Sequence, residues 1–206
     1  MKDKHGNPSH KTNSDRRVKR TRRLLHSALM SLVIQKKYEL ITVQEILDQA
    51  DIGRSTFYMH FRDKDDLLFS GFEYLEAFLE SAQDISAKTH AQPYARIIGF
   101  SRAMFEHAQE YRRVNRALLG SSAEAVVRRR IHSVLAGIAS RELKLELQRR
   151  KGRNIPVAPD LLVHFLVSTY TSVLMWWLNS RNPVSPEEID SSYRLLVLPT
   201  LASIFG

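Results

Sequence analysis

The 206-residue chain contains no cysteine. This absence excludes disulfide frameworks, cysteine-ligated zinc, iron–sulfur clusters and catalytic or redox-sensing thiols. Long hydrophobic runs are also missing, because the longest candidate for the roughly 20 apolar residues that span a bilayer, residues 161–178, is interrupted by polar side chains. The basic N-terminus is followed by polar residues and not by the apolar stretch of a signal peptide. We therefore expect a cytoplasmic protein that does not bind membranes.

Acidic side chains are in deficit. There are 31 Lys and Arg residues against 22 Asp and Glu, a net charge of +9, which favours a polyanionic partner such as nucleic acid or anionic lipid. The charge lies mainly in residues 1–23, with nine basic and two acidic side chains, and in residues 124–153, with nine basic and three acidic ones. For the second stretch two interpretations stay open, namely a solvated helix face and a site that attracts an acidic effector.

Hydrophobic periodicity predicts an all-α fold with about nine helices. Residues 1–15 are too polar to bury surface and are expected to form a flexible basic arm. A helical stripe that contains Leu25, Leu29 and Val33 begins at Arg16. After a long amphipathic helix from Lys64, further helices are expected at 92–107, 110–119, 122–151, 159–180 and 186–205, separated by Gly and Pro breaks. We find no convincing alternating strand.

Two short helices precede the long one. Thr42 and Glu45 form a capping box that starts a helix ending by Ala50. Residues 51–53 read as a tight turn, and residues 54–61 as a second short helix. A helix-turn-helix of this kind places its second helix in the major groove, with the N-terminal residues against base edges.

The N-terminal residues of the second helix are Arg54, Ser55 and Thr56. Arginine can donate two hydrogen bonds to guanine, and Ser or Thr can address several bases, so these three are the predicted base-contacting residues. The predicted phosphate ligands around this helix carry hydroxyl, imidazole or ammonium groups: Thr42, Tyr58, His60 and Lys64. Thr21, near the start of the first helix, is a further predicted phosphate ligand. Deletion of residues 1–15 is expected to weaken operator binding and to flatten its salt dependence.

The run from Thr42 to Leu68, with its core Thr-Phe-Tyr-x-His-Phe-x-Asp-Lys-x-x-Leu-Leu, resembles the DNA-binding signature of TetR-family transcriptional regulators. The resemblance covers residues 18–70. It implies a homodimeric, ligand-responsive repressor that binds a palindromic operator, with a DNA-binding domain at 16–62 and a linker helix and C-terminal ligand-binding and dimerisation domain at 63–206. One departure is Asp51, where the family often has Gly; because Asp tolerates a left-handed backbone, we expect the same turn geometry at a small cost in stability.

The last two predicted helices, at 159–180 and 186–205, have apolar faces that are too wide to be covered by a single partner. Their similarity to the closing helices of the family implies a four-helix dimer interface. Its predicted members are Phe165, Tyr170, Val173, Leu174, Trp177, Tyr193, Leu196 and Val197.

A pocket for a small-molecule effector of unknown identity is expected in the C-terminal half, with Phe100, Met104, Tyr111 and Trp176 as candidate lining residues. No metal site and no cofactor are predicted, because no histidine pair with a nearby carboxylate has ligand spacing. An enzyme is not expected, since the sequence has no glycine-rich phosphate loop and no nucleophile elbow. The alternatives that remain are a TetR-like protein-binding coactivator, a transcriptional activator and, more distantly, a membrane-surface protein that uses its basic arm.

Overall fold

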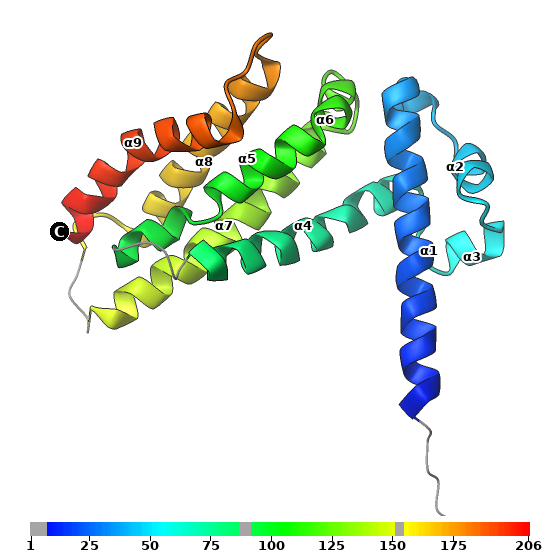
Figure 1. Cartoon of the computed structure of the whole chain (residues 1–206), viewed down its shortest axis with the longest axis horizontal. Coiled ribbons are helices and arrows are strands. Elements are labelled where there is room, and N and C mark those ends of the chain that lie inside the picture. Colours follow the sequence, from blue (N-terminus) through cyan, green and yellow to red (C-terminus); the bar gives the residue numbers. More distant parts are fainter. Residues whose placement is uncertain (1–7, 87–91, 151–154) are drawn as a thin grey trace, which may run out of the picture. The chain divides into compact units, whose positions relative to one another are not determined.

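A computed structural model describes residues 8–86, 92–150 and 155–206 of the chain, and every regular element in these ranges is helical (Figure 1). The described part contains nine α-helices, two 3-10 helices and no strand. The prediction of an all-α fold is therefore confirmed. The chain divides into two compact units, and the division falls within α4, after Gly71.

The N-terminal unit is built from short elements around one long helix. Its elements are α1 (Pro8–Gln35), the 3-10 helix η1 (Tyr38–Leu40), α2 (Val43–Ala50), α3 (Arg54–Tyr58) and the first turns of α4 (Lys64–Ser86). The core of this unit takes Leu25, Leu29 and Val33 from α1, and all three are buried. The stripe predicted from the sequence is thus the buried face of α1, which packs on α2.

Two boundaries in this unit differ from those expected. Helix α1 begins at Pro8, not at Arg16, because a nucleated helix extends into flanking polar residues at little cost and proline fits its first turn. Of the predicted flexible arm, residues 1–7 lie outside the described residues. The unit also extends past residue 62, since Leu67 and Leu68 of α4 are buried and Tyr38 donates a hydrogen bond to Asp65.

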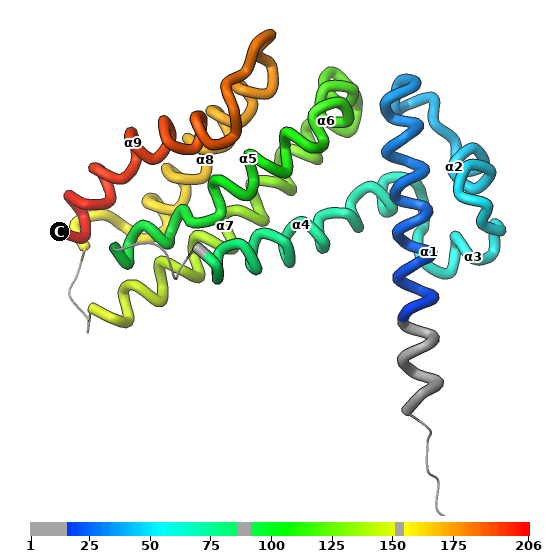
Figure 2. Tube along the Cα trace, in the orientation of Figure 1, coloured from blue at the N-terminus to red at the C-terminus, as the bar shows by residue number. Residues whose placement is uncertain are grey.

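The C-terminal unit is a bundle of five α-helices, with the end of α4 and one 3-10 helix (Figure 2). These elements are η2 (Pro93–Ile98), α5 (Ser101–Glu110), α6 (Arg112–Leu118), α7 (Glu124–Arg149), α8 (Pro159–Asn179) and α9 (Pro186–Phe205). Helix α8 contacts α5, α6, α7 and α9 and so lies at the centre of the bundle.

The single helix expected at 92–107 is two elements. A 3-10 helix ends at Ile98 and α5 starts at Ser101. The buried Gln83 of α4 donates a hydrogen bond to the carbonyl of Arg96, and its side chain occupies the place that a Cβ on Gly99 would take. We attribute the break to this packing of Gln83 against Gly99. The hydrophobic periodicity of residues 92–107 could not predict it, because Gln83 lies outside that segment.

Aromatic side chains fill the centre of the bundle. Tyr170 lies 4.8 Å from Phe105 and 5.1 Å from Tyr193, measured between ring centroids. Its hydroxyl donates to the carbonyl of Ser101 at 2.9 Å, and the hydroxyl of Tyr193 donates to the carbonyl of Leu166 at 3.1 Å. Burial raises the pKa of both tyrosines above the usual range, so both remain neutral donors.

This core changes the predicted dimer interface. Five of its eight members are buried within a single protomer: Tyr170, Leu174, Trp177, Tyr193 and Val197. Their area is covered by the chain's own helices and is not available to a second copy. Phe165, Val173 and Leu196 keep surface that a partner could cover.

Helix α8 is also long and apolar enough to cross a membrane by length and composition. Half of its apolar window is buried inside the protomer. Its buried residues include Leu166, Tyr170 and Trp177. The helix is therefore accounted for as the central core helix of the bundle.

Candidate nucleic-acid interface

The capping box at the start of α2 fixes the first helix of the motif. The Thr42 hydroxyl accepts a hydrogen bond from the Glu45 N–H at 3.3 Å, and the Glu45 carboxylate accepts one from the Thr42 N–H at 2.9 Å. Lys36 also donates to Glu45. The hydrogen bonds from Lys36 and then from Thr42 lower the pKa of Glu45 to about 2. The box predicted from the sequence is confirmed, and the Lys36–Glu45 contact joins the start of α2 to the end of α1.

The turn after α2 depends on one residue with a positive φ. Asp51 has φ 52° and ψ 49°, a left-handed conformation, and its N–H donates to the carbonyl of Leu47. The geometry expected for Asp51 is thus confirmed. Gly53 has an ordinary φ of −70° and open space beside it, so the turn itself does not require glycine at position 53.

Helix α3 is held by aromatic side chains and presents its N-terminus to solvent. Phe57 is fully buried and Phe61 is nearly so, with ring centroids 5.7 Å apart. At the start of the helix Arg54 and Ser55 are exposed, while Thr56 is half-buried. A buried anchor with exposed donors at the helix N-terminus is the geometry by which a recognition helix reads base edges.

Two polar residues of α2 orient Arg54. The Arg54 Nη2 donates to the Gln44 Oε1 at 2.7 Å, and the Gln44 Nε2 donates to the Asp48 Oδ1 at 2.7 Å. All three side chains are exposed. Gln44 is not among the residues predicted from the sequence to contact DNA; the available signal is that Gln44 and Asp48 are polar neighbours at i, i+4 on the helix that precedes α3.

The predicted phosphate ligands have different surroundings. Thr42 and Tyr58 are exposed, and Thr21 and His60 are half-buried. Lys64 is engaged within the protein: its Nζ donates to the carbonyls of Tyr38 and Ile41 at 2.8 Å and of Glu39 at 3.2 Å. The ammonium also lies 4.7 Å from the centroid of the Tyr38 ring. In this arrangement Lys64 ties α4 to η1.

The N-terminal half of α1 carries a run of exposed positive charge. Arg16, Arg17, Lys19, Arg20 and Arg23 are all exposed. They lie on the helix that packs on α2. The basic residues from Arg16 onward, which the sequence places next to a flexible arm, therefore lie on a regular helix.

Two profiles of protein families match the chain. One, described as "Bacterial regulatory proteins, tetR family", matches residues 25–70, and another, "Transcriptional regulator C-terminal region", matches residues 97–196. The first match contains the α2–turn–α3 motif. The chain belongs to the TetR family of transcriptional regulators. It is a DNA-binding regulator and not an enzyme.

Individual relatives agree with this assignment. The "Uncharacterized HTH-type transcriptional regulator YxbF" of Bacillus subtilis (strain 168) is 42% identical over 55 residues, which are 26% of this chain. The matched segment spans only 14% of that relative.

Among solved structures, a putative TetR-family transcriptional regulator from Syntrophomonas wolfei str. Goettingen has a TM-score of 0.73 at 20% identity, covering 89% of this chain and 96% of that one. FadR of Thermus thermophilus, a TetR-family repressor solved with lauroyl-CoA, has a TM-score of 0.58 at 18% identity, covering 86% and 93%. These likenesses concern the fold.

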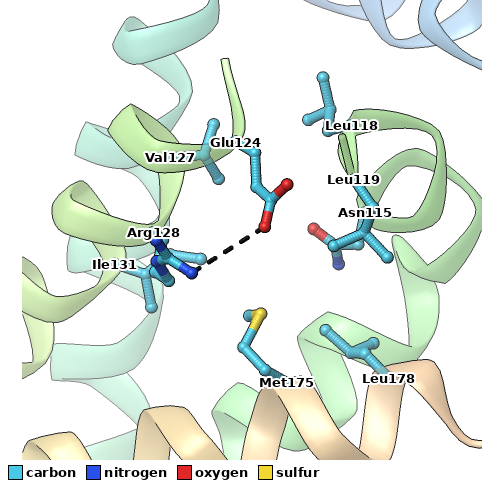
Figure 3. A pocket seen from close by; sticks show the side chains of 9 residues that line it. All are labelled: Asn115, Leu118, Leu119, Glu124, Val127, Arg128, Ile131, Met175 and Leu178. Atoms are coloured by element: carbon cyan, nitrogen blue, oxygen red, sulfur yellow. Dashed lines mark ion pairs between the residues drawn. The ribbon is translucent and has the colours of Figure 1, made fainter. Parts of the chain in front are cut away.

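A pocket opens in the C-terminal unit of this TetR-family regulator between α6, α7 and α8 (Figure 3). It is lined by Asn115, Leu118, Leu119, Glu124, Val127, Arg128, Ile131, Met175 and Leu178. None of the four predicted lining residues is among them. Phe100 and Met104 are buried core residues, and Trp176 is 65% exposed. The aromatic residues at helical spacing in α5 are thus core, and the pocket has an aliphatic wall.

Three arginines in the second half of α7 are paired with carboxylates. Arg141 pairs with Glu80 of α4. Arg149 and Arg150 lie 3.4 and 3.3 Å from the buried Glu146, and Arg150 also lies over the ring of Phe205. These contacts favour a structural role for the second half of α7 over a site that attracts an acidic effector.

Proposed function

We propose that this TetR-family protein is a cytoplasmic, ligand-responsive repressor that binds a palindromic operator as a homodimer. The observation that carries the proposal is the presentation of α3: Phe57 is buried beneath it, and Arg54 and Ser55 are exposed at its N-terminus. Inserted in the major groove, Arg54 reads a guanine through two hydrogen bonds, and Ser55 and Thr56 address the neighbouring bases.

Phosphate contacts set the register of this helix on the duplex. Thr42 and Tyr58 are exposed on the same motif, at the start of α2 and the end of α3. Thr21 and His60 complete the set, with part of each side chain accessible. Lys64 joins them only if its ammonium leaves the three carbonyls that it now binds.

The dimer interface is proposed on the exposed faces of α8 and α9. Leu161, Phe165 and Trp176 on α8 are 59%, 44% and 65% exposed, and Leu195 and Leu196 on α9 are 75% and 71% exposed. Exposed apolar side chains grouped in this way mark interaction surfaces. A two-fold axis would bring the same residues of both copies together and would place two copies of α3 on two half-sites.

Ligand response is supported by the pocket between α6, α7 and α8. FadR of Thermus thermophilus, a repressor of the same fold, has been solved in complex with lauroyl-CoA. An effector that binds the C-terminal unit better in one conformation shifts the population of DNA-competent dimers.

Selection of bound sequences from a random pool of duplex DNA tests the central claim. We expect the full-length protein to enrich a palindrome with two equivalent half-sites, and the Arg54→Ala variant to lose enrichment at one position of each half-site. Arg129→Ala, on the exposed surface of α7, is the matched control and should return the wild-type sequence. Enrichment of no sequence, together with salt-sensitive binding to all of them, would contradict the proposal.

The homodimer has its own test. Phe165→Glu combined with Leu196→Glu places two charges on each copy of the proposed interface, and sedimentation should show a monomer where the wild type is a dimer. Leu145→Glu, on an exposed part of α7, should leave the dimer intact. If the double variant is still a dimer, the interface lies on another surface and the proposed one is wrong.

A further inference from the structure

We propose that the α6–α8 pocket binds a small, mainly apolar compound that carries one neutral hydroxyl group, such as an alkylphenol or a short alcohol. That binding at this site regulates DNA binding rests on the proposed function. The ligand class itself rests on the pocket's own side chains.

The wall of the pocket is aliphatic. Leu118, Leu119, Val127, Ile131, Met175 and Leu178 line it. The space open to the centre of a water-sized sphere is about 30 Å³, whereas a single water needs roughly 10–15 Å³ by the same measure. The enclosed space therefore has room for about two or three waters, so it takes only a few atoms of a ligand, and the rest of a ring lies at the open side of the pocket near the exposed Arg128. Met175 is unbranched and can adapt its shape to an apolar occupant.

The polar side of the pocket holds a carboxylate and a guanidinium in a loose pair. The Glu124 Oε1 lies 4.0 Å from the Arg128 Nη1, beyond hydrogen-bond distance. The Gly120 N–H donates to the other carboxylate oxygen at 2.7 Å, which fixes the position of the carboxylate. In Figure 3 this carboxylate and the amide of Asn115 both point into the space between the helices.

A hydroxyl group fits between these partners. The hydroxyl can donate a hydrogen bond to the Glu124 carboxylate while its oxygen accepts one from Arg128, because a hydroxyl is both donor and acceptor. Both bonds are charge-assisted and therefore stronger than neutral ones.

Charged ligands fit less well. A carboxylate would face the Glu124 carboxylate at short range, and an ammonium would face Arg128. Each would also lose water on entering a pocket whose other side chains, apart from Asn115, are aliphatic, which is costly without full compensation. Arg112 and Arg116 do not provide positive charge for an anionic ligand. Both donate to backbone carbonyls at the end of α8, including that of Leu178.

The experiment compares four ligands that share one apolar ring. The DNA-free, full-length protein is titrated calorimetrically with p-cresol, toluene, 4-methylbenzoate and 4-methylbenzylammonium. We expect p-cresol to bind at least about tenfold more tightly than each of the others, where tenfold corresponds to 1.4 kcal/mol. Tighter binding of the anion or the cation, or equal binding of toluene and p-cresol, would overturn the proposed class.

Variants place the binding at this pocket. Val127→Phe fills the space and should abolish p-cresol binding, whereas Leu145→Phe, on an exposed part of α7, should not. Glu124→Gln removes the repelling charge and should raise the affinity for 4-methylbenzoate at least about tenfold, while Arg128→Met should weaken p-cresol binding and Arg129→Met should not. Circular dichroism and urea unfolding establish that each variant is folded.

The remaining outcomes are also decisive. Failure of all four ligands to bind, or binding that Val127→Phe leaves unchanged, overturns the site. If p-cresol binds as expected but does not alter operator affinity, the pocket assignment holds and the proposed ligand response is contradicted. The two proposals can thus fail separately.

Discussion

The guanidinium of Arg54 is oriented by an exposed amide on the preceding helix. Gln44 accepts from Arg54 and donates to Asp48, so the three side chains form a chain across α2 and α3. An arginine that is already held loses less side-chain freedom when it meets a base. We therefore propose that Gln44 positions Arg54 for its base contact.

This role can be measured by a double-mutant cycle on the selected operator. Arg54→Ala should cost about 1–3 kcal/mol of binding free energy and relax the preference at one base pair. Gln44→Ala should cost part of that amount, and the double variant should cost no more than Arg54→Ala alone, because Gln44 acts through Arg54. Gln49→Ala, also exposed on α2, is the control. Additive losses would show that Gln44 contacts DNA independently.

Lys64 shows why a motif position does not reveal a residue's whole role. Its ammonium binds three carbonyl oxygens around η1, and a hydrogen bond of a charged group contributes about 1.5–3 kcal/mol net of the hydration that is lost. From the sequence alone, the lysine could be placed at the start of a helix but not against carbonyls more than twenty positions earlier in the chain.

We expect Lys64→Met to lower the free energy of unfolding by about 2 kcal/mol, as measured by urea denaturation. Lys37→Met changes an exposed lysine and should have little effect. The salt dependence of operator binding by the same variant then tests the phosphate role: the slope should fall by about 1 if Lys64 also binds a phosphate. An unchanged stability would contradict the structural role.

At the scale of elements, the turn between α2 and α3 carries a cost that the sequence predicts. Asp51 adopts a left-handed backbone, which is unfavourable for most L-residues by about 1–2 kcal/mol and less so for Asp. Its negative charge also lies at the C-terminus of α2, where the helix dipole disfavours it. Glycine would remove both effects.

Asp51→Gly should therefore raise the free energy of unfolding by up to about 1 kcal/mol. Asp51→Ala should lower it, because alanine has no means of easing the left-handed conformation. Gln49→Gly, inside α2, is the opposite control and should cost about 1 kcal/mol. Destabilisation by Asp51→Gly would mean that the aspartate side chain itself holds the turn.

The elements were predictable where local chemistry determines them. The Thr42 and Glu45 box is a short-range pattern and gave the start of α2 correctly. The break near Gly99 depends on Gln83 from another helix, and the burial of Tyr170 and Trp177 depends on which helices cover them. An apolar face in a sequence shows that something covers it, but not whether that partner is the same chain or a second copy. For this reason, neither the pocket nor the burial of five predicted interface residues within this chain could be placed from the sequence.

At the scale of the whole molecule, the net charge of +9 separates into two parts with different roles. On α7, Arg141, Arg149 and Arg150 pair with carboxylates. On α1, Arg16, Arg17 and Arg20 are exposed on a helix that packs on the reading motif. We therefore expect the polyanion to bind the exposed charge of α1, which packs on α2, although Arg129 and Arg130 are also exposed on α7.

Salt titrations of operator binding test this division. Each phosphate contact contributes about 0.9 to the slope of log affinity against log salt concentration. We expect that changing Arg16, Arg17 and Arg20 together to Ala reduces the magnitude of the slope by about 1–3, and that deletion of residues 1–15 also reduces it. Arg129→Ala with Arg130→Ala removes two exposed charges of α7 and should leave the slope unchanged. If the α7 pair altered the slope and the α1 set did not, the anionic partner would lie at the C-terminal unit, and the +7 of the first 23 residues would need another explanation.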